Sequence, residues 1–190
     1  MTGPIVAVTP PIPPWAQMSP GRLAHVERVV GLVDQWALAM GVPEPDRRRW
    51  LRAAWLHDAL RDADPAELAR WAPGAFGSVE LWHGPAAASR AAAEGETDRG
   101  ILDAVRFHSV GSADWDMMGR VLYCADFLEP GRAFDRAERA ALAGRLPAEP
   151  ARVFFEVVQR RMGHLIRSGW TLPDSTVQLW NSLASAGSSP

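Results

Sequence analysis

The feature that most restricts the fold of this chain is the helical spacing of its apolar residues between proline and glycine boundaries. From Pro20 to Met40, apolar side chains recur at steps of three and four residues, and Gly41 and Pro43 follow. This spacing puts them on one face of an amphipathic helix, and the glycine and proline mark its end. Comparable segments continue along the chain without a repeat or a convincing strand pattern. The sequence therefore predicts an all-α fold.

Boundary residues predict where the other helices begin and end. Proline and aspartate favour helix starts, and glycine favours helix ends. Thr97 and Asp98 should cap one helix, and in another we expect the apolar residues, including Leu165 and Ile166, to face inward. The expected helices are residues 46–60, 66–71, 85–93, 98–108, 115–128, 135–146, 151–167 and 173–184.

Length and composition set the domain organisation. A chain of 190 residues, 47% hydrophobic and 22% charged, can bury one good core. We expect a single compact helical bundle over residues 19–185, with a motif-bearing core at about 20–135 and C-terminal helices at about 135–185. A Pro-rich arm (1–18) should precede it, and a flexible tail (186–190) should follow.

Charge and cysteine content narrow the class of protein. The net charge of −2 gives no sign of a nucleic-acid or membrane partner that binds through bulk positive charge. Cys124 is the one cysteine, which excludes an internal disulfide and a cysteine-rich zinc module. No stretch approaches the roughly 18 apolar residues of a membrane span, and the N-terminal prolines do not resemble a secretion signal. We therefore expect a cytoplasmic protein that binds neither nucleic acid nor membranes.

The stretch R-A-A-W-L-H-D-A-L at residues 52–60 carries the most chemical information. His57 and Asp58 are adjacent there and have apolar neighbours on both sides. Burying a lone carboxylate is unfavourable, but the penalty is relieved if the pair ligates a cation at the helix edge. A salt-bridged or surface pair is the alternative, because one His-Asp dipeptide is a weak signal. A metal site is our leading interpretation of this stretch.

Further imidazole and carboxylate groups accompany this pair on other expected helices. His25, His83 and His108 lie at helix starts, helix ends or near apolar faces, and Asp126 interrupts an apolar run. Six nitrogen and oxygen donors without thiolates suit iron, manganese or zinc, and a set of this size suits two ions. Each histidine alone is more often an ordinary core or surface residue, so the prediction depends on their joint placement. His164 has no motif around it and is expected to be structural or exposed.

The order of these residues resembles a known family. The similarity lies in the segments R-L-A-H-V, L-H-D-A-L-R, W-H-G-P-A-A-A, F-H-S-V-G and L-Y-C-A-D-F-L-E-P-G-R, within about residues 20–135. These segments look like the HD-domain superfamily of metal-dependent phosphohydrolases, and within it the bacterial YqeK-type branch. The resemblance implies an HD-domain bundle that hydrolyses diadenosine tetraphosphate symmetrically to two ADP, using iron.

The resemblance also implies a role for each ligand. Asp58 would bridge two ions, and a hydroxide between them would attack phosphorus. The pair would be divalent or mixed-valence iron, with manganese or zinc as alternatives. The expected metal ligands are His25, His57, Asp58 and Asp126 at one ion, and Asp58, His83 and His108 at the other.

Residues near the ligands are candidates for contacts with substrate. Arg61, which replaces a lysine common in this branch, and Arg132 are expected to hold phosphates, since a planar guanidinium fits phosphate oxygens. A surface ion pair is the alternative for each. Ser109 and Gly111 belong to a His-Ser-Val-Gly segment where the branch usually has His-Thr-x-Gly, and both should contact substrate. Asp62 would protonate a leaving group or be a solvated helix-end carboxylate. The expected catalytic residues are Asp58, Arg61 and Asp62.

Other functions and contacts stay open at this point. Trp82 and Trp115 are candidates for stacking on adenine, with core packing as the alternative for each. A nucleotidase or other phosphomonoesterase of the same superfamily is one alternative function. A non-catalytic nucleotide-binding HD module is another, against which the complete ligand set argues. The expected partner is a small nucleotide, and the protein would be a monomer or a homodimer.

Overall fold

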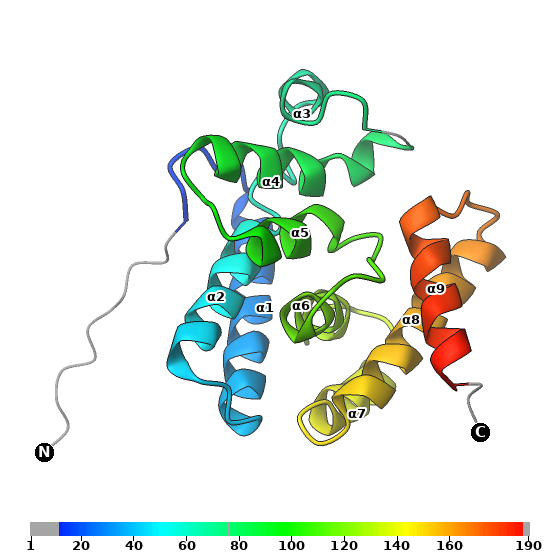
Figure 1. Ribbon diagram of the computed structural model, residues 1–190. Coiled ribbons are helices and arrows are strands. Elements are labelled where there is room, and N and C mark those ends of the chain that lie inside the picture. The colour runs from blue at the N-terminus through cyan, green and yellow to red at the C-terminus, as the bar shows by residue number, and fades with distance from the viewer. Residues whose placement is uncertain (1–11, 76, 188–190) are drawn as a thin grey trace, which may run out of the picture.

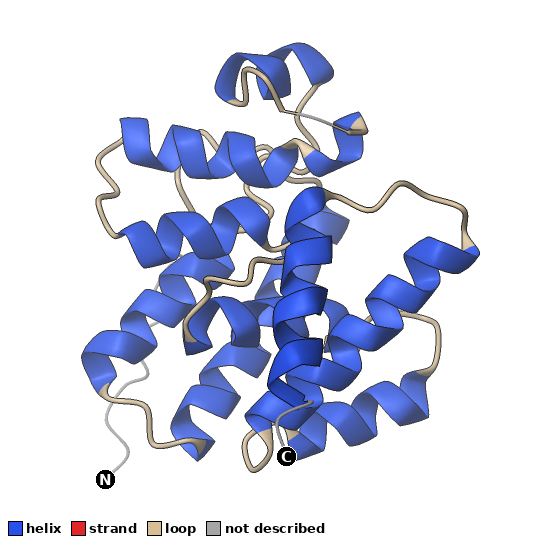
Figure 2. Ribbon diagram, turned by 45° about the vertical axis from the view of Figure 1, so that its right-hand side comes forward, coloured by secondary structure: helices blue, strands red, loops and turns tan. Residues whose placement is uncertain are grey.

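The computed structural model describes residues 12–75 and 77–187, which form α-helices joined by loops (Figures 1 and 2). No strand occurs in this part of the chain, so the predicted all-α class is confirmed. Residues 1–11 of the expected arm and 188–190 of the expected tail lie outside the described residues. The helices are α1 (Pro20–Ala39), α2 (Glu44–Leu56), α3 (Pro65–Trp71), the short 3₁₀ helix η1 (Val79–Leu81), α4 (His83–Ala93), α5 (Arg99–Phe107), α6 (Met117–Leu128), α7 (Arg136–Arg145), α8 (Pro150–Arg167) and α9 (Asp174–Gly187).

Several helices begin at a polar side chain that accepts a hydrogen bond from the backbone three residues later. Ser19 caps α1 in this way, and Asp64, Asp98 and Asp116 cap α3, α5 and α6. Such a cap satisfies one of the amides that a first helical turn leaves without a partner. The predicted cap at Asp98 is confirmed.

The predicted end of the central helix is wrong. α2 (Glu44–Leu56) stops before residue 60, so His57 and Asp58 lie in the turn that follows it. The amide of Arg61 donates to the carbonyl of Asp58, a three-residue step that belongs to a tight turn rather than to an α-helix. The local sequence contains good helix formers throughout, so contacts from elsewhere in the chain determine this turn.

Residues 12–18, the described end of the Pro-rich arm, supply some of the contacts that determine this turn. The Gln17 amide donates to the carbonyl of Ala59 at 2.7 Å, and the Asp62 amide donates to the carbonyl of Gln17 at 3.3 Å. Trp15 packs against the core. Residues 12–18 therefore lie on the body and hold the turn that carries the His-Asp pair.

Helix α6 forms the centre of the molecule. It packs against α1, α2, α5, α7 and α8, and Figure 1 shows it end-on among them. Most of its residues are buried, including Asp126. A polar side chain on this helix is therefore surrounded by protein on several sides. None of the described helices is both long enough and apolar enough to cross a membrane.

The C-terminal helices differ from the prediction in two places. α9 continues through Gly187, so the backbone at residues 186–187 is helical where a tail was expected. Ile166 was expected to face inward but is 60% exposed. Its neighbour Leu165 lines a cavity, and successive helical residues diverge by about 100°, which turns Ile166 outward.

Helix α4 approaches the C-terminal end of α5 very closely at Gly84. A Cβ atom at this position would lie 2.8 Å from the carbonyl oxygen of Arg106 and 3.0 Å from that of Val105. The preceding residue, His83, places its Nε2 atom 3.0 Å from Nε2 of His108. The absence of a side chain at Gly84 therefore allows these two imidazoles to meet.

The variant Gly84→Ala is expected to lower the free energy of unfolding by about 1–3 kcal/mol, because the added methyl group overpacks the contact between α4 and α5. Gly31→Ala is a matched control in α1, where a Cβ would meet nothing within 4 Å. That change should stabilise the protein by about 0.5–1 kcal/mol, since glycine is unfavourable inside a helix. Urea unfolding of both variants measures the difference, and a Gly84→Ala protein as stable as the wild type would contradict the argument.

Candidate metal centre

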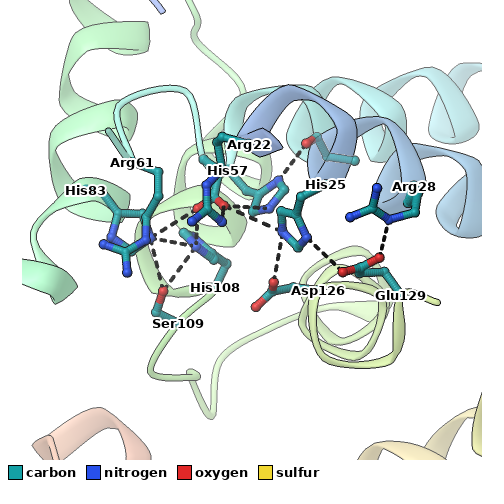
Figure 3. A network of polar contacts seen from close by, with 12 residues as sticks. Arg22, His25, Arg28, His57, Arg61, His83, His108, Ser109, Asp126 and Glu129 are labelled. Carbon is teal, nitrogen blue, oxygen red and sulfur yellow. Dashed lines mark hydrogen bonds and ion pairs between the residues drawn. The ribbon is translucent and has the colours of Figure 1, made fainter. Parts of the chain in front are cut away.

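The six side chains predicted as metal ligands meet in the interior, in two adjacent groups (Figure 3). Within each group, one ligand atom per residue lies within 4.8 Å of the others. All six residues are buried. They come from α1, the turn after α2, the start of α4, the turn after α5, and α6. The groups are His25, His57 and Asp126, and Asp58, His83 and His108.

Asp58 lies between the two groups. Its Oδ1 atom is 3.2 Å from Nε2 of His83 and 3.4 Å from Nε2 of His108. Its Oδ2 atom is 3.6 Å from Nε2 of His25 and 3.6 Å from Nε2 of His57. One carboxylate oxygen thus faces each group, which is the arrangement that a carboxylate bridging two cations requires.

The four imidazole rings are oriented by hydrogen bonds at their other nitrogen. Each Nδ1 atom contacts an oxygen that can only accept a hydrogen bond, so the proton is on Nδ1. The lone pair of Nε2 is then available to a metal. The sequence places three of the acceptors within the same helical turn as the histidine. The contacts are His57 with the Ala54 carbonyl (2.7 Å), His83 with the Glu80 carbonyl (2.7 Å), His108 with the Val105 carbonyl (2.8 Å) and His25 with the Glu129 carboxylate (3.2 Å).

One buried nitrogen provides a test of whether this group of residues fits a metal. His57 is fully buried, and its Nε2 atom has no hydrogen-bond partner among the described residues. A buried polar atom without a partner is unfavourable by about 1–3 kcal/mol. Burial lowers the pKa of His57 to about 4, so the ring is neutral near pH 7 and its lone pair is available. The atom points into the cluster, where a cation would satisfy it.

The two aspartates supply the negative charge that a cation needs. Burial disfavours ionisation of Asp58, but the adjoining His57, His108 and His83 hold its pKa well below the usual range. Burial also disfavours ionisation of Asp126, but His25, Arg132 and Arg161 hold its pKa well below the usual range. Both carboxylates are therefore ionised. Nitrogen and oxygen donors in this mixture suit iron, manganese or zinc.

Glu129 is a buried residue of this site that the sequence interpretation missed. It is 2% exposed and contacts Nδ1 of His25, while Nε of Arg28 donates to its second oxygen at 2.5 Å. The amide of Gly131 also donates to that oxygen, at 2.7 Å. In Figure 3, Arg28 and Glu129 lie beside His25, on the side away from His83. Glu129 therefore fixes the direction in which the His25 ring presents Nε2.

Glu129→Gln is expected to weaken metal binding about 10- to 100-fold, the usual range when a group that orients a ligand is changed. The amide keeps the size of the side chain but loses the charge that holds the ring proton of His25. Glu27→Gln, on the exposed face of α1, is the control. Metal retained after dialysis against a series of chelator concentrations gives the affinities, and equal retention by the Glu129 variant and the wild type would refute the orienting role.

Three of the predicted substrate contacts lie on the wall of a cavity of about 760 Å³ that reaches the cluster. Arg61 donates to the carbonyl of Glu80 at 3.2 Å, and Arg132 contacts Oδ1 of Asp126 at 2.6 Å. The hydroxyl of Ser109 lies 3.0 Å from Nε2 of His108. Small-molecule sites are commonly about 300–1,000 Å³ in volume, so this cavity has the size of a ligand site.

Apart from the metal ligands, two predicted site residues do not line this cavity, namely Asp62 and Gly111. Asp62 accepts a hydrogen bond from the Ser19 amide at 2.8 Å and lies 3.8 Å from Nε of Arg22. Gly111 has a φ of 86°, and a Cβ there would lie 2.5 Å from a side-chain carbon of Leu179. Asp62 therefore contacts the start of α1, and Gly111 packs against α9.

The two tryptophans considered as candidates for stacking on adenine also lie outside the cavity lining. Trp115 is 5% exposed, and its ring lies 5.6 Å from that of Tyr123, so it packs in the core, which was the alternative for this residue. Trp82 is half-buried and packs against the core. His164, to which the sequence assigned no function, is exposed and lines the cavity.

Arginines that the sequence interpretation did not single out also reach the ligands. Nη1 of Arg22 lies 2.7 Å from Oδ2 of Asp58. Arg161 on α8 donates to the carbonyl of Ser109 at 2.7 Å and lies 3.3 Å from Oδ2 of Asp126. No local pattern marks Arg161, because α8 reaches this site only through tertiary packing. Arg22 lies three residues before His25, in the R-L-A-H-V segment.

Comparisons with known proteins place these observations in context. A family model described as HD domain matches residues 22–143. Two curated proteins named Bis(5'-nucleosyl)-tetraphosphatase, symmetrical, are similar to part of the chain. The one from Bacillus subtilis (strain 168) is 45% identical over 56 residues, which are 29% of this chain and 30% of that protein. The one from Halalkalibacterium halodurans is 34% identical over 65 residues, which are 34% of this chain and 35% of that protein.

The chain thus spans about a third of the length of the curated relatives it matches. A solved structure from Clostridium acetobutylicum, described as a predicted HD superfamily hydrolase involved in NAD metabolism, has a similar fold. The TM-score is 0.77 and the identity is 21%, over 89% of this chain and 92% of the solved chain. At this identity the similarity is one of fold.

Proposed function

Because the chain belongs to the HD domain family, we propose that it is a metal-dependent phosphohydrolase whose six buried ligands hold two cations. The observation that carries this proposal is the position of Asp58, which directs one oxygen to each group of histidines. We further propose iron as the metal, with manganese and zinc as alternatives. Two bound cations would lower the pKa of a water molecule and stabilise charge on phosphoryl oxygens.

The substrate that we propose is diadenosine tetraphosphate, cleaved symmetrically to two ADP. The names of the two curated relatives support this choice, over the partial lengths that they match. Arg61 and Arg132 line the cavity and would hold the phosphates on either side of the reacting one. The planar fork of a guanidinium can bind two phosphate oxygens at once.

The leaving group affects which residues the reaction needs. A terminal phosphate has a second pKa of about 6, so ADP can leave as an anion near neutral pH. The reaction therefore does not require a general acid, which agrees with the engagement of Asp62 by Ser19 and Arg22. Ser109, whose hydroxyl lies between His83 and His108, would contact a phosphoryl oxygen.

Product analysis tests this proposal. The metal-loaded protein is incubated with diadenosine tetraphosphate, and the products are separated by anion-exchange chromatography. ADP as the sole product is expected. ATP together with AMP would refute symmetrical cleavage, and phosphate release from AMP or ADP without cleavage of the dinucleotide would favour a nucleotidase. Nucleotide binding without any turnover would favour a non-catalytic module.

A further inference from the structure

Part of the cavity wall comes from the C-terminal end of α8 and the loop after it. His164, Arg167 and Trp170 line the cavity there, and Phe134 joins them from the loop between α6 and α7. In Figure 1, α8 lies beside α6, the helix that carries Asp126, and α9 lies beside α8. Residues 164–170 lie beyond the segment 22–143 that the family model matches. The family match therefore assigns no role to residues 164–170.

The wall exposes aromatic surface to the cavity. Among the described residues, the large hydrophobic side chains with strong exposure are Leu38, Phe134, Ile166 and Trp170. Two of these four, Phe134 at 50% and Trp170 at 61%, line the cavity that reaches the metal cluster. Apolar surface left in water is unfavourable, and exposed aromatic rings inside a cavity are typical of a ligand site.

Trp170 is held in place by the way α8 ends. The amide of Trp170 donates to the carbonyl of Leu165, and the amide of Gly169 donates to that of Ile166, both at 3.1 Å. Gly169 has a φ of 66°. These are the two hydrogen bonds and the left-handed residue of a Schellman motif. The ring of His164 packs edge-on against the indole, with ring centroids 5.6 Å apart. The indole is thus positioned before any ligand binds.

Arg167, whose guanidinium has no carboxylate partner among the described residues, precedes Trp170 by three residues in the sequence. Arg167 lines the cavity, is exposed, and forms no ion pair within the described part of the chain. Arg160, about two turns earlier on α8 and also in the cavity lining, is instead paired with Glu138 at 2.6 Å. An unpaired guanidinium can bind a phosphate, and an indole held in place can stack on a base. Arg167 and Trp170 together therefore offer one group for each part of a nucleotide.

We propose that Trp170 and Arg167 form the subsite for one nucleoside half of a dinucleoside polyphosphate, with the base stacked on Trp170 and a phosphate paired with Arg167. The identity of this substrate rests on the proposed function, and the subsite adds to it by explaining how a base of the substrate is held. A purine gives the larger stacking surface and is the base expected.

Calorimetric binding to the metal-loaded protein tests the subsite without relying on turnover. The two probes are a methylene-bridged, non-hydrolysable analogue of diadenosine tetraphosphate, and inorganic tripolyphosphate, which has no base. Mg²⁺ in excess over each probe prevents removal of the protein's ions. Trp170→Ala should weaken binding of the dinucleotide analogue about tenfold, within the usual range for base stacking, and leave tripolyphosphate binding unchanged. Trp170→Phe should restore most of the loss.

Two further variants separate the contributions of base and phosphate. Arg167→Gln should weaken binding of both probes, because it removes charge rather than stacking surface. Ile166→Ala is the matched control, since Ile166 is 60% exposed on the same helix and does not line the cavity. It should bind both probes as the wild type does. Circular dichroism spectra of all variants establish that the helices are intact.

The outcomes distinguish this proposal from the proposed function. Equal affinity of Trp170→Ala and wild type for the dinucleotide analogue would overturn the subsite, as would an equal loss for both probes or no binding by the wild type. A base-dependent loss in Trp170→Ala supports the subsite whatever the products of turnover are. Failure to form ADP from diadenosine tetraphosphate would overturn the proposed function alone.

Discussion

Asp58→Asn is expected to lower the turnover of diadenosine tetraphosphate by about 10³-fold or more. A metal centre contributes several kcal/mol of charge stabilisation in the transition state, and each 1.36 kcal/mol corresponds to about tenfold in rate. Among the residues that the structure describes, Asp58 is the one whose carboxylate oxygens form close contacts with both groups of histidines. A neutral amide is a weak ligand and cannot bridge two cations, so both ions should be held less tightly.

Two measurements on the purified variant check this expectation. Metal analysis should give well under two ions per chain, and kcat should fall in parallel. Asp103→Asn, an exposed carboxylate on α5, should change neither quantity. An Asp58→Asn enzyme that retained two ions and wild-type kcat would mean that the carboxylate does not bridge. The variant also removes the partner that lies 2.7 Å from Arg22, so thermal unfolding must be recorded beside activity.

His83→Ala is expected to remove one ion of the two and most of the turnover, while the helical content stays unchanged. His83 belongs to the group with Asp58 and His108, and its loss leaves that group with two protein ligands. The other group keeps all of its ligands. Metal analysis should therefore fall from two ions to one, which a general loss of structure would not produce.

Imidazole added to the solution gives an independent check on His83→Ala, since it can occupy the space left by the side chain and restore part of the activity. Ser89→Ala, on the same helix but not among the cavity residues, should behave as the wild type. An unchanged rate at saturating metal would count heavily against a centre with two ions.

The helical class and the clustering of the six candidate ligands could be predicted because both depend on short local patterns in the sequence. Apolar spacing and capping residues such as Asp98 act within a single turn of helix. The His-Asp pair at residues 57–58 is recognisable as a short motif. The end of α2 could not be predicted, since the turn after it depends on backbone bonds from Gln17, about 40 residues away along the chain.

The residues around the ligands were harder to predict, for a physical reason that the tryptophans make clear. Trp115 and Trp170 are the same residue type beside polar neighbours, yet one is 5% exposed and the other 61%. The difference arises from which helices pack over each residue, which no local pattern records. Arg161 was missed for the same reason, because α8 reaches Asp126 only in the folded molecule.

If the six candidate ligands hold cations as proposed, their distribution over five chain segments links cation uptake to completion of the fold. A fragment that ends before Asp126 lacks one member of the set. A cation that binds only the finished protein adds its binding energy to the stability of that state. Metal loading would then stabilise the fully folded molecules and leave the incompletely folded ones without this stabilisation.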